Sequence, residues 1–133
     1  MKKKWNRNGS VLLIAVFAIA LLSTLVAGIL QVNTEELMIM KNQIDSVEAR
    51  AIANAGLNDA FAQLRNDSAW NDGFSSKSFS GGTYSVNVSG NLPELSVVSK
   101  AVLDGFSAKV SADVTISGTS PHLIQVTAFR INE

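Results

Sequence analysis

The stretch VLLIAVFAIALLSTLVAGIL, from Val11 to Leu30, decides the first half of the fold. It contains no charged side chain, and as a helix rising about 1.5 Å per residue it would span roughly the 30 Å hydrocarbon core of a bilayer. Four of the eleven basic residues of the chain precede it, namely Lys2, Lys3, Lys4 and Arg7. Because basic flanks stay in the cytoplasm, we expect a single-pass inner-membrane helix followed by a periplasmic C-terminal part.

A cleaved secretory signal is the alternative interpretation of this stretch. Such signals have an apolar core of about 7–15 residues, followed by a site with small residues at alternate positions. The core here is longer, and Leu30, Gln31 and Val32 provide no such site. The sequence therefore favours an anchor that stays in the protein.

The helical pattern continues beyond the apolar stretch. Residues 35–64 contain no Pro, and apolar residues recur in steps of three and four, which is typical of an amphipathic helix. We expect one helix from about Ser10 to Arg65, with two helices and a kink near Asn33 as the alternative. The stripe predicted to pack on the rest of the domain contains Ile44, Val47, Ala51, Ala55, Phe61 and Leu64.

The remaining residues favour a β-sheet. Residues 66–82 form a predicted polar connection, and strands are predicted at 83–89, 95–103, 106–116 and 123–131. Asp104-Gly105 indicates a hairpin turn. The predicted fold class is α+β, with a long N-terminal helix packed on a four-stranded antiparallel meander. The predicted segments are 1–9, 10–34, 35–66 and 67–133.

Composition excludes several classes of function. Eleven basic and eleven acidic residues give no net charge, so direct binding of nucleic acid is not expected. No cysteine is present, and His122 is the only histidine. No cofactor, no metal and no enzymatic activity are predicted, because no nucleophile has a base and an orienting group near it in the sequence. Asp and Asn residues at 66–73 do not follow the standard spacing of a calcium loop.

A short basic leader that ends in Gly9, followed by an uncharged helix and then a sheet, resembles the type IV pilin and pseudopilin superfamily. In that family a prepilin peptidase cuts after the Gly and keeps the apolar helix, whose new N-terminus is often methylated. The resemblance implies a processing site between Gly9 and Ser10. It covers the leader, the helix and the helix-then-sheet plan, but not the sequence of the sheet.

A second resemblance lies in residues 50–57, RAIANAGL, followed by Ala60 and Leu64. This stretch is similar to a helix motif of PilX-like minor pilins and K-type minor pseudopilins, with Asn54 where those proteins often have Glu. Most pilins also carry Glu at the fifth position after the cut, where this chain has Ile14. Because PilX-like and K-type proteins often lack that carboxylate too, its absence implies a minor, priming or tip role.

The resemblance implies that the apolar helix packs in a filament, where small residues permit close helix contacts. The implied filament-packing residues are Ile14, Ala15, Ala18 and Gly28. The implied partners are other pilin or pseudopilin subunits, a prepilin peptidase, an inner-membrane assembly platform and membrane lipid. The implied function is to initiate, cap or assemble a type IV pilus or a type II secretion pseudopilus. The alternative is a signal-anchored periplasmic interaction domain that does not assemble.

Overall fold

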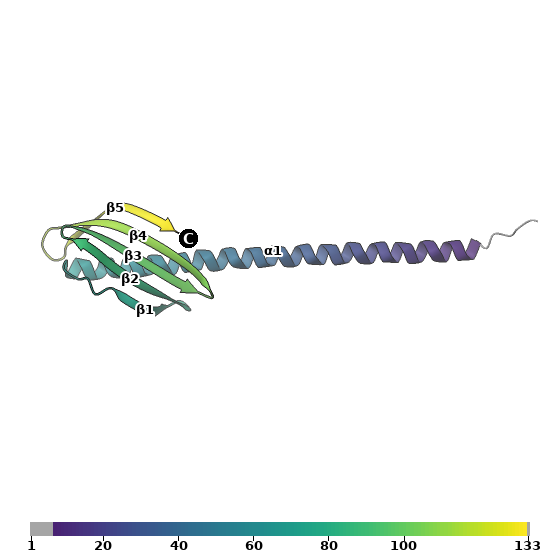
Figure 1. Ribbon diagram of the computed structural model, residues 1–133, viewed down its shortest axis with the longest axis horizontal. Helices are drawn as coiled ribbons and strands as arrows, with labels where there is room; N and C mark the ends of the chain where they lie inside the picture. The colour runs from purple at the N-terminus through teal and green to yellow at the C-terminus, as the bar shows by residue number, and fades with distance from the viewer. Residues whose placement is uncertain (1–6, 133) are drawn as a thin grey trace, which may run out of the picture. The chain divides into compact units, whose positions relative to one another are not determined.

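The computed structural model describes residues 7–132 of the chain. One helix, α1 (Arg7–Asn66), is followed by five strands, which are β1 (Phe74–Phe79), β2 (Gly82–Asn91), β3 (Glu94–Leu103), β4 (Phe106–Ser117) and β5 (Leu123–Asn132) (Figure 1). The chain forms two units, the first ending at Lys41 and the second beginning at Asn42. The predicted α+β class, with a long N-terminal helix and an antiparallel sheet, is confirmed.

The described part of the first unit consists of α1 alone. The helix begins at Arg7, three residues before the predicted start, and its backbone is helical through Asn33, where a kink was the alternative. Residues 1–6 of the predicted leader lie outside the described residues.

The second unit contains one sheet with the strand order β1-β2-β3-β4-β5, and every neighbouring pair is antiparallel. The prediction of four strands was wrong, because β1 lies within the segment expected to be a polar connection. Its sequence, FSSKSF, has little of the alternation that marks a strand. Backbone pairing with β2, including Lys77 opposite Tyr84, makes it a strand, and this pairing depends on tertiary context rather than on composition.

The turns follow the predicted chemistry. Asp104 and Gly105, between β3 and β4, have φ values of +46° and +85°, which are the two positive values that a type I′ turn needs. Residues 118–122 join β4 to β5 and cover the C-terminal end of α1. The His122 N–H donates to the Arg65 carbonyl at 2.9 Å, which satisfies one of the acceptors left free where the helix ends.

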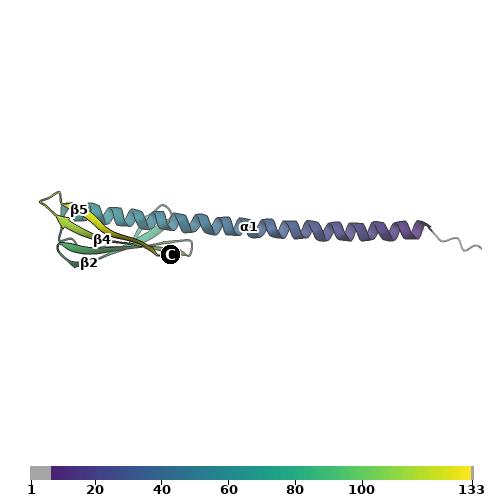
Figure 2. The ribbon, with the colours of Figure 1, turned by 90° about the horizontal axis from the view of Figure 1, so that it is seen from above.

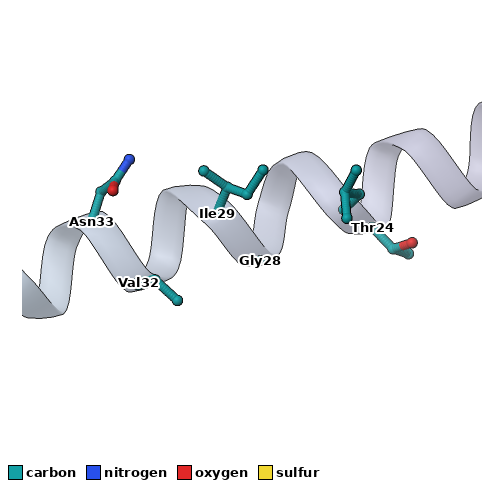
Figure 3. A pocket seen from close by; sticks show the side chains of 6 residues that line it. Thr24, Gly28, Ile29, Val32 and Asn33 are labelled. Atoms are coloured by element: carbon teal, nitrogen blue, oxygen red, sulfur yellow. The ribbon is translucent and has the colours of Figure 1, made fainter.

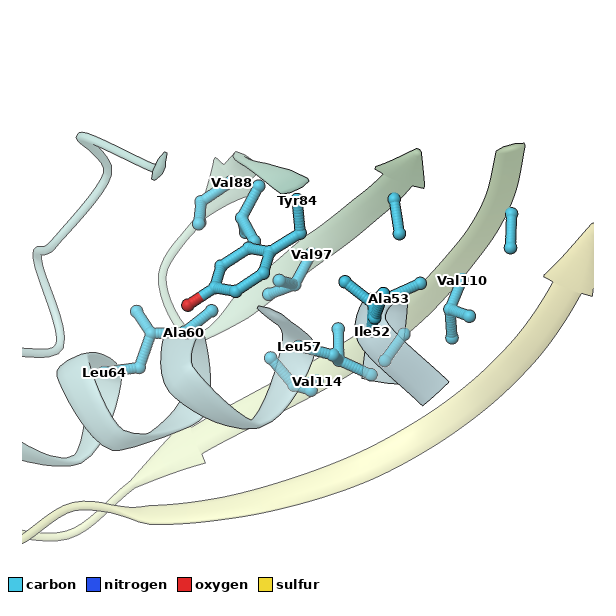
Figure 4. Packing of buried hydrophobic residues seen from close by; sticks show 14 of the residues in the cluster. Ile52, Ala53, Leu57, Ala60, Leu64, Tyr84, Val88, Val97, Val110 and Val114 are labelled. Atoms are coloured by element: carbon cyan, nitrogen blue, oxygen red, sulfur yellow. The ribbon is translucent and has the colours of Figure 1, made fainter. Parts of the chain in front are cut away.

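The core of the second unit lies between one face of the sheet and residues 49–64 of α1, and Figure 2 shows the strands on one side of this segment. Alternate residues of β2, β3 and β4 point toward the helix, and Figure 4 shows labelled members of this set against α1. Trp70 and Phe74 pack against this core from the connection and from β1. The helix contributes Ala49, Ile52, Ala53, Leu57, Ala60 and Leu64, all of them buried.

The predicted packing stripe of the helix was wrong at three of its six positions, Ile44, Val47 and Ala51. Ile44 and Val47 are 61% and 63% exposed, and Ala51 is also exposed. Ala55 and Phe61 are half-buried, with Phe61 in contact with the core, and only Leu64 is fully buried. The side of the helix opposite Ile44, Val47 and Ala51 packs on the sheet instead, since residues at steps of three and four share one face. Its buried residues are Ala49, Ile52, Ala53, Leu57 and Ala60.

The physical reason for this difference is the small size of the residues at the contact. A Cβ atom placed on Gly56 would lie 2.5 Å from Ser99 Oγ and 2.7 Å from Tyr84 Cδ2. The helix therefore approaches the sheet too closely for a side chain at this position. The core uses a face rich in Gly and Ala, while larger apolar residues at 44 and 47 remain outside it.

Candidate functional site

The first candidate site is the apolar surface of α1 in the first unit. Every large apolar side chain from Val11 to Val32 is exposed, by 53% to 71%. By length and composition this helix is able to cross a membrane. A helix that is apolar on all sides and packs against nothing in its own unit is typical of a segment that lies in lipid or among other helices.

The polar side chains within the apolar stretch are satisfied inside the helix. Ser23 Oγ donates to the Ile19 carbonyl at 2.8 Å, and Thr24 Oγ1 donates to the Leu21 carbonyl at 2.8 Å. Because hydrocarbon provides no hydrogen-bond partner, these internal bonds lower the cost of placing hydroxyl groups in lipid. The helix is therefore compatible with an apolar environment along residues 11–30.

The predicted processing residues, Gly9 and Ser10, lie in the first turns of α1, and both are exposed. A Cβ atom on Gly9 would meet nothing within 4 Å. The peptide bond between them is therefore accessible at the end of a helix, where terminal turns open most easily. The described surroundings of Gly9 give no packing reason for a glycine there.

The predicted filament-packing residues Ile14, Ala15, Ala18 and Gly28 are all exposed along the same helix. Gly28 lies in a shallow hollow of the helix surface, where a Cβ atom would also meet nothing within 4 Å (Figure 3). Thr24, Leu25, Ile29, Val32 and Asn33 line the rest of this hollow. Small residues on a helix surface permit the close approach of a neighbouring helix.

In the second unit, the most concentrated polar contact joins β1 and β2 to α1. Lys77 Nζ lies 2.5 Å from Asp59 Oδ2, and the Tyr84 hydroxyl donates to the same oxygen at 2.7 Å. The Lys77 ammonium also lies over the Phe74 ring, 4.7 Å from its centroid. This contact holds the short edge strand β1 against the helix.

The charges of this contact stabilise one another. Hydrogen bonds from Lys77, and then from Tyr84, hold the pKa of Asp59 below its usual value. The hydrogen bond to Asp59 raises the pKa of Lys77. Burial, followed by the hydrogen bond to Asp59, raises the pKa of Tyr84. The carboxylate, the ammonium and the neutral phenol are therefore the forms favoured near neutral pH.

His122 lies in the connection that covers the end of α1, with Nδ1 2.9 Å from the Gly118 carbonyl. Its hydrogen bonds are with the backbone carbonyls of Gly118 and Arg65, so it has a structural role in this connection. Among residues 7–132, no group of three His, Asp or Glu side chains is placed to hold a metal ion.

Sequence reasoning missed the residues that position the helix on the sheet. Ala49, Ala53 and Ala60 have the helical spacing of a packing face, but their small side chains give a weak hydrophobic signal. The contact between Asp59 and Lys77 joins residues 18 positions apart, and no local pattern predicts it.

Searches for similar proteins found no matching protein-family model, no matching curated protein and no matching solved structure.

Proposed function

We propose that the chain is a pilin-like subunit, of the minor pilin or pseudopilin kind, that helps to initiate, cap or assemble a filament. The observation that carries this proposal is that the two parts of α1 have different surroundings. Residues 11–30 expose only apolar side chains and hydroxyl groups bonded within the helix, whereas residues 49–64 pack on a small antiparallel sheet. Such a helix joins a folded domain to a segment that needs lipid or other helices around it.

The proposal assigns a role to each part of the helix. The basic leader stays in the cytoplasm and is removed after Gly9, so that Ser10 becomes the N-terminus. The apolar segment rests in the inner membrane and then moves into a bundle of similar helices, where Ala15, Ala18 and Gly28 permit close approach. The sheet domain lies on the periplasmic side. The work is mechanical, and no reaction is assigned to the chain.

Ile14 distinguishes this subunit from the bulk subunit of a filament. A carboxylate at this position would balance the N-terminal ammonium of a neighbouring subunit, since a buried charge needs a partner. Isoleucine provides no such balance. We expect Ile14→Glu to change how much of the chain enters filaments. Incorporation equal to that of the unmodified chain would refute the role assigned to Ile14.

The processing step is tested with two matched glycine variants. Gly9→Leu places a bulky side chain before the proposed cut and should block cleavage by a coexpressed prepilin peptidase. Gly28→Leu makes the same change further along the same exposed helix and should leave cleavage unchanged. Normal cleavage of the Gly9 variant would refute the assigned site.

A further inference from the structure

The first turn of α1 contains residues that favour a turn rather than a helix. Asn-Gly is among the dipeptides that most often form tight turns, and Asn, Gly and Ser all rank low in helix propensity. In the structure, however, Asn8, Gly9 and Ser10 all have helical backbone. The local preference of these residues therefore conflicts with the conformation that they adopt.

Nothing in the described structure requires a glycine at position 9. Its backbone is helical, and a Cβ atom on Gly9 would meet nothing within 4 Å. An alanine would fit the same space and would favour the helix more strongly. At Gly56, by contrast, the close approach of the sheet excludes a side chain. Gly9 therefore weakens the helix without any gain in packing.

The charges near this turn weaken it further. The first turn contains no acidic residue, and the described helix begins at Arg7. Lys2, Lys3 and Lys4 precede it in the sequence. Because the N-terminus of a helix carries partial positive charge, basic residues near it are unfavourable. Charge and helix propensity thus both favour opening of the first turn.

The helix after this turn has the opposite character. From Val11 to Leu30 it is apolar, and in lipid its backbone groups have no hydrogen-bond partner outside the helix, so opening there would be costly. The weak turn ends where the apolar helix begins, next to the peptide bond between Gly9 and Ser10. Conflicts between local preference and adopted structure are expected at functional sites.

We propose that the first turn of α1 opens before cleavage, and that Asn8 and Gly9 set the cleavage rate by weakening the helix at this point. The inference rests on the proposed processing after Gly9 and deepens it by assigning what regulates that site. When opening and closing are fast relative to cleavage, the rate of proteolysis follows the population of the open form.

The reaction shows why opening matters. Hydrolysis adds water across the peptide bond between Gly9 and Ser10, so that the hydroxyl group joins the Gly9 carbonyl carbon and the hydrogen joins the Ser10 nitrogen. In the helix the Gly9 carbonyl accepts the N–H of Leu13, four residues further on. Opening of the turn frees this carbonyl from the helix and makes it available to the peptidase.

The first part of the test measures cleavage of full-length variants over time in membrane vesicles that contain a prepilin peptidase. Gly9→Ala should slow cleavage about five-fold, and Asn8→Ala about three-fold, because these factors correspond to the differences in helix propensity. Gly28→Ala is the matched control, since a Cβ atom there also meets nothing within 4 Å. It should leave the rate unchanged.

The second part measures opening without the peptidase. Hydrogen exchange in detergent is followed by NMR for the amides of residues 11–13, whose helical acceptors are the carbonyls of residues 7–9. In Gly9→Ala this exchange should slow by the same factor as cleavage. Adding Leu13→Gly to Gly9→Ala weakens the same turn at another residue, so it should restore fast exchange and most of the cleavage rate.

The outcomes separate opening of the helix from direct recognition of glycine. A peptidase that recognises only the missing side chain would cut Asn8→Ala at the normal rate and would not cut Gly9→Ala faster after addition of Leu13→Gly. Either result would overturn the inference, as would slower cleavage of Gly9→Ala without slower exchange. These results would leave processing after Gly9 in place. Failure of the peptidase to cut the unmodified chain would refute the proposed processing and this inference with it.

Discussion

The Tyr84 hydroxyl donates to Asp59 Oδ2 at 2.7 Å, and this single oxygen joins strand β2 to helix α1. Lys77, on β1, binds the same oxygen. Two strands are thus attached to the helix through one carboxylate. This contact attaches the edge strand β1, which has few apolar residues, to the helix.

The first prediction concerns the pH dependence of this contact. Asp59→Asn should lower the free energy of unfolding by about 1 kcal/mol at pH 7, because one charged acceptor is lost. The pKa of Asp59 is lowered by folding, so its contribution is present above its usual value of 3.8 and is lost as pH falls through the folded value. Below the folded pKa of Asp59, the free energies of unfolding of Asp59→Asn and its parent should therefore become equal.

The contribution of Lys77 to stability has the opposite pH dependence. Its pKa is raised from the usual 10.5, so its contribution is present below that value and is lost as pH rises through the folded pKa. Urea unfolding in detergent at different pH values measures both pH dependences, that of Asp59 and that of Lys77. All the proteins carry Trp5→Phe, so that Trp70 fluorescence alone follows unfolding. A constant difference between Asp59→Asn and its parent from pH 3 to pH 7 would contradict the role of the carboxylate.

The second prediction concerns Gly56. Gly56→Ala should destabilise the second unit by about 1–3 kcal/mol, the usual range for an overpacked core, because its Cβ would lie 2.5 Å from Ser99 Oγ. Gly28→Ala is the matched control, since a Cβ there meets nothing within 4 Å. The same urea measurement should separate them, and equal effects would show that the helix is not closely packed at Gly56.

The third prediction concerns Ser99, whose Oγ is buried without a hydrogen-bond partner among the described residues. Ser99→Ala should leave the free energy of unfolding unchanged or raise it by up to about 1 kcal/mol, since it removes an unsatisfied polar group. Thermal unfolding in detergent provides the measurement. A clear loss of stability would mean that this hydroxyl makes a stabilising bond.

The fourth prediction tests which side of α1 packs on the sheet. Ile52→Ala should cost about 2–5 kcal/mol, as is usual for a buried isoleucine, because Ile52 is 1% exposed. Ile44→Ala makes the same change at 61% exposure and should cost less than about 0.5 kcal/mol. Hydrogen exchange of the β3 amides reports both effects in the membrane. A larger loss of stability with Ile44→Ala than with Ile52→Ala would mean that the stripe predicted from the sequence packs on the sheet.

Much of the fold was predictable because the strands show strong local patterns. In β4, alternation from Ala108 to Ile116 matches the buried positions, and Asp104-Gly105 marks the turn before it. The apolar helix was equally clear, because no charge interrupts it. These features depend on local sequence, which a single chain displays directly.

The errors arose where tertiary context decides the structure. On α1, two sets of residues have helical spacing, and the set with larger side chains was the more hydrophobic one. Close approach of helix and sheet at Gly56 selected the other set. The strand β1 forms through pairing with β2. In β5, Thr127 is an extra residue, because Val126 is opposite Val114 and Ala128 is opposite Asp113, and this bulge depends on pairing with β4. Spacing alone does not distinguish the two helix faces, and neither the pairing of β1 nor the extra residue in β5 has a local signature.

The most direct test of the central proposal is the intact mass and N-terminal sequence of the full chain produced together with a prepilin peptidase. The proposal predicts loss of residues 1–9 and an N-terminus at Ser10, with or without a methyl group. An intact leader would contradict it and favour a signal-anchored periplasmic domain. A cut near residue 30 would contradict it as well, since the apolar helix would then be absent from the mature protein.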